Sequence, residues 1–355
     1  MVLNAVVTFV VSLFFLIKGA DYFVEAAGRM ATFFRISVML VGLTVVAVGT
    51  SLPELVIGIV SSLEGNSSLV LGNVLGANAA NLGLILGMSA MMGIMNIKRK
   101  IYSRDGLFMM AVSLLFLMTS LDGALGFGDG LLFLAFFSFY LYHLWTTEQH
   151  QDVTFLHHVE KVWVLINPRT YTTLLDKTLQ GDTYRDWWAR YKTYRVNGEG
   201  ESRQWGLLVK DMGTLAVSGF VVFMAAQYLV PAVGEVAVFL GVPSVFVAAV
   251  LLSLGTTMPE MAVSLVAIRK GMGDLVVGNV VGSNIADLML VGGVAAVIAP
   301  IPVGSFALTY LIPSMLFFAA LFLAFVRANW VLRLFHGLIF VLCYLLYVVF
   351  AFLLA

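Results

Sequence analysis

Charged residues are scarce in this chain. Asp, Glu, Lys and Arg together make up 11% of its 355 residues, whereas 61% are hydrophobic. This balance excludes a soluble globular protein and indicates an integral membrane protein with several spans, surrounded by the lipid bilayer. The formal net charge is zero, so no basic excess points to nucleic acid and we expect no such partner. The sequence identifies no protein partner.

Cysteine is also nearly absent. Cys343, the only one, lies in an apolar run near the C-terminus, which excludes a disulfide and a cysteine-based metal site within one chain. The N-terminal segment, from Val2 to about Ile17, lacks a basic region and a small-residue cleavage site. We therefore interpret it as a retained transmembrane helix and not as a signal peptide.

Apolar runs of about 20 residues, long enough to cross a bilayer, occur in two sets of five. A polar stretch at 147–206 separates the sets. The sequence therefore predicts an all-α integral membrane protein with ten transmembrane helices, as a first five-helix repeat at 1–146, a cytoplasmic insert at 147–206 and a second five-helix repeat at 207–355. The expected spans are 2–25, 37–62, 69–95, 106–121, 130–146, 208–230, 243–268, 275–298, 305–326 and 334–354.

Basic residues near the helix ends predict the orientation. If ten helices alternate, these residues fall on one side of the membrane, and the loops on the other side contain no Lys or Arg. Because basic residues concentrate on the cytoplasmic side, we expect a multi-pass cell-membrane protein with both termini extracytoplasmic. The basic residues used are Arg29, Arg35, Lys98, Arg99, Lys100, Arg104, Lys210, Arg269, Lys270, Arg327 and Arg333.

The two halves of the chain repeat one another. Glu54 and Glu260 are 206 residues apart, and Asn73 with Asn279 has the same offset, as does Asn78 with Asn284. Since each half has five predicted helices, an odd number, the second copy would enter the membrane from the opposite side. Such inverted repeats are typical of secondary transporters, whose site lies near the midplane on interrupted helices.

The repeated motif places an acidic residue in an apolar run. It reads Gly-Thr-Ser-Leu-Pro-Glu at 49–54 and Gly-Thr-Thr-Met-Pro-Glu at 255–260. Each proline lacks an amide hydrogen and displaces the carbonyl four residues earlier, so the Gly-Thr segment offers backbone oxygens to a cavity. A carboxylate at the bilayer centre costs about 2.5–3.5 kcal/mol on insertion scales, and it usually marks an ion or substrate path. A ligand-free proline kink is the simpler interpretation, which the doubled glutamate disfavours.

The donor atoms of the motif suit a hard cation. If the inverted halves meet, two glutamates supply four oxygens, and the freed carbonyls of Thr50 and Thr256 supply two more, with no imidazole or thiolate. Calcium takes about 6–8 oxygen ligands, whereas magnesium prefers to keep several waters. The pattern therefore favours Ca²⁺, whose charge balances the carboxylates of Glu54 and Glu260.

A polar stripe follows each motif. Asn73, Ala77 and Asn81 share one face of a helix at four-residue spacing, and the matching stripe is Asn279, Ser283 and Asp287. We expect these stripes to face the ion path; hydrogen bonding between helices is the alternative. The glycines around them, at 72, 76, 278 and 282, form faces that let helices approach closely.

Together, the pairs GTSLPE with GNVLGANAAN and GTTMPE with GNVVGSNIAD resemble the two α-repeats of the sodium/calcium exchangers, within the calcium/cation antiporter superfamily. The resemblance covers both repeats and leaves the insert unmatched. It implies alternating access, no cofactor, and Na⁺ entry that drives Ca²⁺ out. By position it implies a calcium site at Glu54, Glu260 and the carbonyls of Thr50 and Thr256. It implies flanking monovalent-ion sites at Ala47, Ser51, Asn81, Ser253, Thr257, Ser283 and Asp287.

Three residues depart from the pattern of that family. Ala77 stands where serine is usual, so a flanking site loses a hydroxyl. Thr257 replaces another serine but keeps the oxygen. Asp287, opposite Asn81, adds a third carboxylate, which would be protonated or would serve an extra cation. Proton coupling and potassium dependence therefore remain alternatives to sodium.

Other classes of function fit less well. An intramembrane hydrolase could use paired carboxylates as an acid and a base, but catalysis needs no duplicated hydroxyl and amide ligands, and no nucleophile motif is present. We therefore expect a transporter and not an enzyme. A channel could use the same oxygens; it would show flux that does not saturate and needs no counter-ion.

Overall fold

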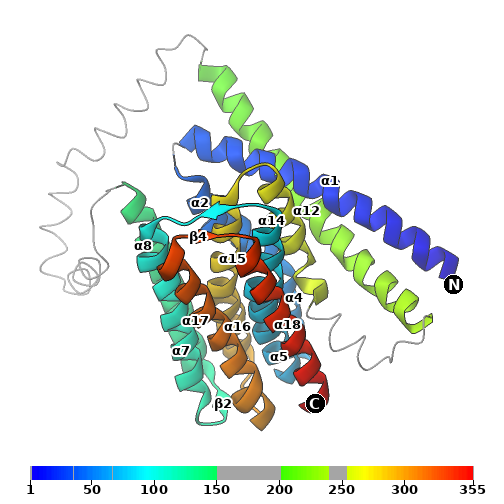
Figure 1. Cartoon of the computed structure of the whole chain (residues 1–355), viewed down its shortest axis with the longest axis vertical. Helices are drawn as coiled ribbons and strands as arrows, with labels where there is room; N and C mark the ends of the chain where they lie inside the picture. Colours follow the sequence, from blue (N-terminus) through cyan, green and yellow to red (C-terminus); the bar gives the residue numbers. More distant parts are fainter. Residues whose placement is uncertain (1, 35, 66, 150–200, 240–253, 355) are drawn as a thin grey trace, which may run out of the picture.

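The computed structural model is almost entirely helical (Figure 1) and describes residues 2–34, 36–65, 67–149, 201–239 and 254–354. Within these ranges, eight helices are long and apolar enough to cross a membrane, or nine when a bent pair counts as one span. The predicted all-α membrane fold is confirmed at this level. The predicted span at 243–268 lies partly outside the described residues, as does most of the predicted insert at 147–206.

Breaks and π-helical turns interrupt several spans of the first half. The long helix α1 is followed by a bent span, a central span with a π-helical turn, and two peripheral spans. Their bounds are α1 (Val2–Phe34), α2 (Val38–Val41), η1 (Gly42–Val46), α3 (Ala47–Thr50), α4 (Leu52–Leu63), α5 (Ser67–Ala80), η2 (Asn81–Ile85), α6 (Leu86–Met92), η3 (Ile101–Gly106), α7 (Leu107–Ser120) and α8 (Phe127–Gln149).

The described part of the second half follows the same order. Its elements are α12 (Glu201–Phe239), α14 (Met258–Arg269), α15 (Gly273–Ala286), η5 (Asp287–Val291), α16 (Gly292–Ile298), η6 (Ala307–Leu311), α17 (Ile312–Asn329) and α18 (Leu334–Leu354). Helix α14 matches α4, α15 matches α5 and η5 matches η2, each at both ends and each 206 residues later. The sequence repeat is therefore also a repeat of local structure. At the edges of the predicted insert, residues 147–149 continue α8 and residues 201–206 open α12.

Two short strand pairs join the halves. Strand β1 (Met95–Asn96) pairs antiparallel with β4 (Val331–Leu332), and β2 (Ala124–Leu125) pairs antiparallel with β3 (Ile301–Pro302). Strands β1 and β3 are related by the same offset of 206 residues. Each half thus contributes one strand to each of these pairs.

Helices α1 and α12 form a pair beside the upright bundle. Figure 1 shows them running obliquely together, whereas α5, α7, α16, α17 and α18 stand roughly parallel. Their backbones approach closely, since a Cβ placed on Gly19 would lie 3.3 Å from the Ser218 carbonyl oxygen. An ion pair from Arg29 Nε to Asp211 Oδ1, at 2.8 Å, also links them. Among the spans that the structure describes in full, Leu69–Met92 and Gly273–Ile298 are the most buried. They place the two polar stripes in the centre.

Candidate cation site between the two halves

Both repeated motifs break their helix at the residue before the Leu-Pro or Met-Pro pair. Ser51 has φ −79° and ψ 9°, and Thr257 has φ −82° and ψ 3°. The bend between Val38–Thr50 and Leu52–Leu63 is 41°. Each proline then lies in the first turn of the next helix. Backbone N–H groups in this turn make no hydrogen bond within the helix, so the proline, which lacks an N–H, costs none. Helical hydrogen bonding resumes at once, from Leu55 N to Ser51 O and from Met261 N to Thr257 O.

The break also sets the position of the acidic residue. Glu54 lies in the first turn of α4 and Glu260 in the first turn of α14. The unpaired backbone N–H groups at a helix N-terminus carry partial positive charge and favour a negative charge nearby. The local structure therefore stabilises each carboxylate before any ion binds. Both residues are 1% exposed.

These buried carboxylates have few hydrogen-bond partners. Among the described residues, neither side-chain oxygen of Glu54 has a partner, and Oε2 of Glu260 has none. Oε1 of Glu260 accepts a bond from Ser51 Oγ at 3.3 Å. A buried charge without partners is strongly unfavourable. The pair therefore calls for a bound cation or for protons.

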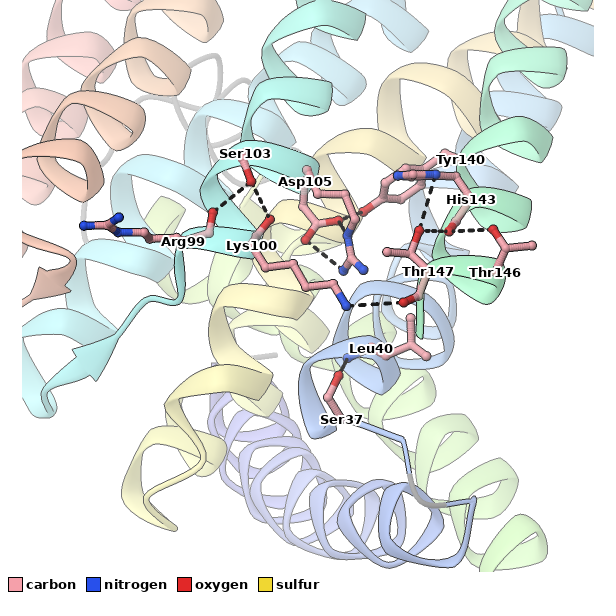
Figure 2. Close-up of polar contacts among 11 residues, drawn as sticks. Ser37, Leu40, Arg99, Lys100, Ser103, Asp105, Tyr140, His143, Thr146 and Thr147 are labelled. Atoms are coloured by element: carbon pink, nitrogen blue, oxygen red, sulfur yellow. Dashed lines mark hydrogen bonds and ion pairs between the residues drawn. The ribbon is translucent and has the colours of Figure 1, made fainter. Parts of the chain in front are cut away.

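Another buried carboxylate shows the opposite arrangement (Figure 2). Asp105 of η3 is fully buried, but Arg104 donates to both of its oxygens, from Nε at 2.8 Å and from Nη2 at 3.0 Å. Tyr140 of α8 adds a third bond, from its hydroxyl to Oδ1 at 3.2 Å. Asp105 is thus neutralised within the fold and serves structure, in contrast to Glu54.

The frame of the site is made of reciprocal bonds between the halves. Thr50 Oγ1 shares its single hydrogen between the Val46 carbonyl of its own span, at 3.0 Å, and Asn279 Oδ1, at 3.2 Å. Thr256 Oγ1 donates to Asn73 Oδ1 at 3.1 Å. The amide of Asn73 also donates to the Glu54 carbonyl, as the amide of Asn279 does to the Glu260 carbonyl, each at 3.4 Å. Each asparagine therefore ties the acidic helix of its own half to the threonine of the other half.

Close backbone contact makes these bonds possible. A Cβ placed on Gly278 of α15 would lie 2.6 Å from the Met39 carbonyl and 3.1 Å from Cα of Gly42. A Cβ on Gly282 would lie 2.7 Å from the Leu43 carbonyl. The second-half helix thus packs directly on α2 and η1 of the first half. This confirms the close approach predicted for Gly278 and Gly282, whereas a Cβ on Gly72 would have no described atom within 4 Å.

Asn81 and Asp287 meet where the central spans change to π-helix. Each is the first residue of its turn, η2 or η5, and π-helical turns occur frequently at functional sites. Asn81 Nδ2 donates to Asp287 Oδ2 over a long 3.5 Å. Asn81 Oδ1, Asp287 Oδ1 and the hydroxyl of Ser283 have no hydrogen-bond partner among the described residues. Unpartnered oxygens therefore extend along the second stripe.

The remaining predicted residues divide into three groups. Ala47 and Ala77 are fully buried and offer only backbone oxygens. Thr257 is buried, and its hydroxyl donates to the Leu254 carbonyl at 3.2 Å. Ser253 lies outside the described residues.

One residue of the site was missed by sequence reasoning. Ser264, fully buried on α14, accepts a hydrogen bond from Asn279 Nδ2 at 3.1 Å. The position equivalent to Ser264 in the first half is Gly58. Aligning the two repeats reveals this difference between serine and glycine. The role of Ser264, however, depends on the position of Asn279 in the fold.

The site is built from oxygen atoms of several kinds. Within the described residues, no group of three or more His, Cys, Asp and Glu side chains is arranged to hold a metal ion. A cation at Glu54 and Glu260 would therefore use hydroxyl, amide and main-chain oxygens as further ligands. A narrow cavity beside Thr50, Pro53 and Pro259 lies between the motifs and the rings of Phe23 and Phe223, which belong to α1 and α12.

Comparison with known proteins agrees with this architecture. The family model described as sodium/calcium exchanger protein matches residues 4–146 and 210–353. The sodium/calcium exchanger MaX1 of Methanosarcina acetivorans is 30% identical over 337 residues, covering 95% of each chain. The chain belongs to the sodium/calcium exchanger protein family. It is thus a multi-pass membrane protein, and the insert lies between the two matched segments.

A further relative and a solved structure extend the likeness. The inner membrane protein YrbG of Escherichia coli K12 is 27% identical over 300 residues, covering 84% of this chain and 81% of the relative. A structure of the sodium-calcium exchanger NCX_Mj superposes with a TM-score of 0.76 at 23% identity, covering 98% of this chain and 99% of that one. That likeness establishes the fold.

Proposed function

We propose that this protein is a secondary active antiporter that exchanges Ca²⁺ for Na⁺ by alternating access at the site between the halves. The observation that carries the proposal is the pair Glu54 and Glu260. These carboxylates come from equivalent helices of the two halves, are buried, and retain oxygens without partners among the described residues. Family membership supports cation antiport, and the relatives named above as exchangers are transporters and not enzymes.

The donor atoms support calcium as the divalent ion. Glu54 and Glu260 with the carbonyls of Thr50 and Thr256 would provide six oxygens, the lower end of calcium's usual range of about 6–8. The Na⁺ sites would flank this cage, using Ala47, Ser51, Asn81, Ser253, Thr257, Ser283 and Asp287. Because Ca²⁺ neutralises both glutamates, it and the sodium set would compete for the same charge. That competition is the basis of exchange.

The proposal includes the topology. Ten spans in two inverted five-helix repeats would place both termini outside the cell and the insert at 147–206 in the cytoplasm. The reciprocal contacts, Thr50 with Asn279 and Thr256 with Asn73, support two halves that exchange roles as the site opens to either side.

A gradient experiment tests the proposal. The purified protein is reconstituted in liposomes, and Ca²⁺ uptake is measured against imposed gradients of Na⁺, K⁺ or H⁺, one at a time. Outward Na⁺ gradients should drive saturable uptake that stops when internal Na⁺ is omitted. Uptake that needs no counter-ion and does not saturate would indicate a channel and contradict the proposal.

Proton-coupled calcium exchange is the second candidate, and potassium dependence is a variant of it. The observation that favours these is the uneven pair Ala77 and Ser283, which leaves one side of the site without a hydroxyl. Asp287 adds a carboxylate that could take a proton or a further cation. Ca²⁺ uptake driven by a pH gradient without Na⁺ would decide for proton coupling.

A further inference from the structure

Ser264 makes the two glutamate sides of the site unequal. In the second half, Asn279 uses its amide to donate both to Ser264 Oγ, at 3.1 Å, and to the Glu260 carbonyl, at 3.4 Å. Its Oδ1 accepts from Thr50 Oγ1 at 3.2 Å. An amide nitrogen has two hydrogens, so both are used and the plane of the amide is held.

The equivalent asparagine of the first half has less support. Asn73 donates to the Glu54 carbonyl and accepts from Thr256, but position 58 is glycine and supplies no hydroxyl. A Cβ at Gly58 would lie 3.0 Å from Cγ1 of Val291, so the glycine instead lets η5 pack closely on α4. The first half therefore has no hydroxyl at position 58 because the close packing of η5 on α4 leaves little room for a side chain there.

The consequence reaches the ion ligands. Asn279 connects three segments: the end of α3 through Thr50, the first turn of α14 through the Glu260 carbonyl, and the second turn through Ser264. If its amide is held, Thr50 and the backbone at Glu260 are held relative to each other. Selectivity among divalent cations depends on cavity size and on the flexibility of the ligands.

We propose that Ser264 is a positioning residue that stiffens the Glu260 side of the cage and thereby sets the preference for Ca²⁺ over the larger Sr²⁺. This inference rests on the proposed function, since it assumes a divalent ion at Glu54 and Glu260. The stiff side holds the Thr50 carbonyl at a distance from the Glu260 carboxylate that suits Ca²⁺. Without Ser264, the amide of Asn279 can turn, and the cage expands at lower cost around a larger ion.

The test measures Ca²⁺ and Sr²⁺ binding by titration calorimetry on the purified full-length protein in detergent. S264A should weaken Ca²⁺ binding by about 3- to 10-fold, the usual worth of one hydrogen bond. Sr²⁺ binding should weaken less, so the Ca²⁺/Sr²⁺ preference falls. S264T keeps the hydroxyl and should restore the preference. S264C, with nearly the same volume and a weak acceptor, should resemble S264A and replaces it if the alanine variant does not fold.

S113A is the matched control. Ser113 is also a buried helical serine, but its hydroxyl bonds to the Met109 carbonyl of its own helix α7, at 2.8 Å. Its loss should leave the Ca²⁺/Sr²⁺ preference unchanged. An unchanged preference in S264A and S264C would overturn the inference, as would an equal loss for both ions. Failure of the wild type to bind either ion would instead contradict the proposed function.

Discussion

The two halves of this protein share a frame but differ in the atoms that face the proposed ions. The Thr-Asn bonds are reciprocal, with Thr50 on Asn279 and Thr256 on Asn73 at nearly equal distances. Around this frame, Ser51 Oγ donates to Glu260 Oε1, whereas neither carboxylate oxygen of Glu54 has a hydrogen-bond partner among the described residues. The repeat therefore preserves the geometry that brings the halves together, while the ligand positions are free to diverge.

Three pairs of equivalent positions near the proposed ion path differ in the oxygens or the charge that they carry. The second half has Ser264, Ser283 and Asp287 where the first half has glycine, alanine and Asn81. Each substitution adds an oxygen or a charge to the second half. We infer that binding a divalent ion depends on what the halves share, and that selectivity and coupling depend on where they differ.

Replacing either shared carboxylate should have the largest effect. E54Q and E260Q keep the shape of the side chain but remove one of two charges, so each should reduce Ca²⁺ uptake by proteoliposomes roughly 100-fold or more. E64Q is the matched control, because Glu64 is an exposed acidic residue at the end of the same helix α4. Substantial uptake by only one of the two variants would break the equivalence of the glutamates.

Overpacking the backbone contact between the halves should have the next largest effect. G278A adds a methyl group against the Met39 carbonyl and Gly42, and such overpacking typically costs about 1–3 kcal/mol of unfolding free energy. The measurement is thermal unfolding in detergent. In G213A, a helical glycine with no described atom within 4 Å of the added Cβ, stability should not fall. A fully stable G278A would mean that the close contact does not set the position of α15.

Making the third pair alike should alter coupling more than calcium binding. D287N gives both halves an amide at the first residue of the π-helical turn. Because Asp287 lies outside the proposed calcium cage, the Ca²⁺ affinity should change little. The concentration of coupling ion that half-saturates uptake should change more. We expect this concentration to shift by about 10-fold, the lower end of the worth of one contact with a charged group. A larger effect on Ca²⁺ than on the coupling ion would place Asp287 in the calcium cage.

The smallest effect is expected for A77S, which gives the first half the hydroxyl that Ser283 provides in the second. One added neutral ligand should lower the Na⁺ concentration for half-maximal uptake about two- to threefold. The same titration on wild type and variant measures it. Unchanged Na⁺ dependence would show that position 77 lies outside the coupling-ion path.

Much of the fold could be predicted from the repeat. The offset between Glu54 and Glu260 applies to whole helices, because equal hydropathy and equal break residues produce equal local structure. The π-helical turns at Asn81 and Asp287 were not predicted, since they depend on one extra residue per turn and not on composition. Neither were the strand pairs, because two-residue strands leave no alternating pattern and form only where the halves meet.

The site could be predicted in part for a similar reason. Thr50, Glu54 and their equivalents lie in a local motif whose chemistry is readable from the chain. The role of Ser264 depends on Asn279, 15 residues later in the chain, and that of Asn279 on a threonine 229 residues earlier. The register of α15 on the first half fixes these distances. The glycine at 278 predicts close backbone contact, but no pattern of residue types specifies which segment of the first half packs there.

We infer that the two halves share one divalent site. Equilibrium dialysis with radioactive Ca²⁺ counts the ions bound per chain in wild type, E54Q and E260Q. We expect one Ca²⁺ per wild-type chain, and none in either variant at a concentration that saturates the wild type. Two ions per wild-type chain, with one retained in each variant, would show that each half binds its own ion and would contradict the shared site.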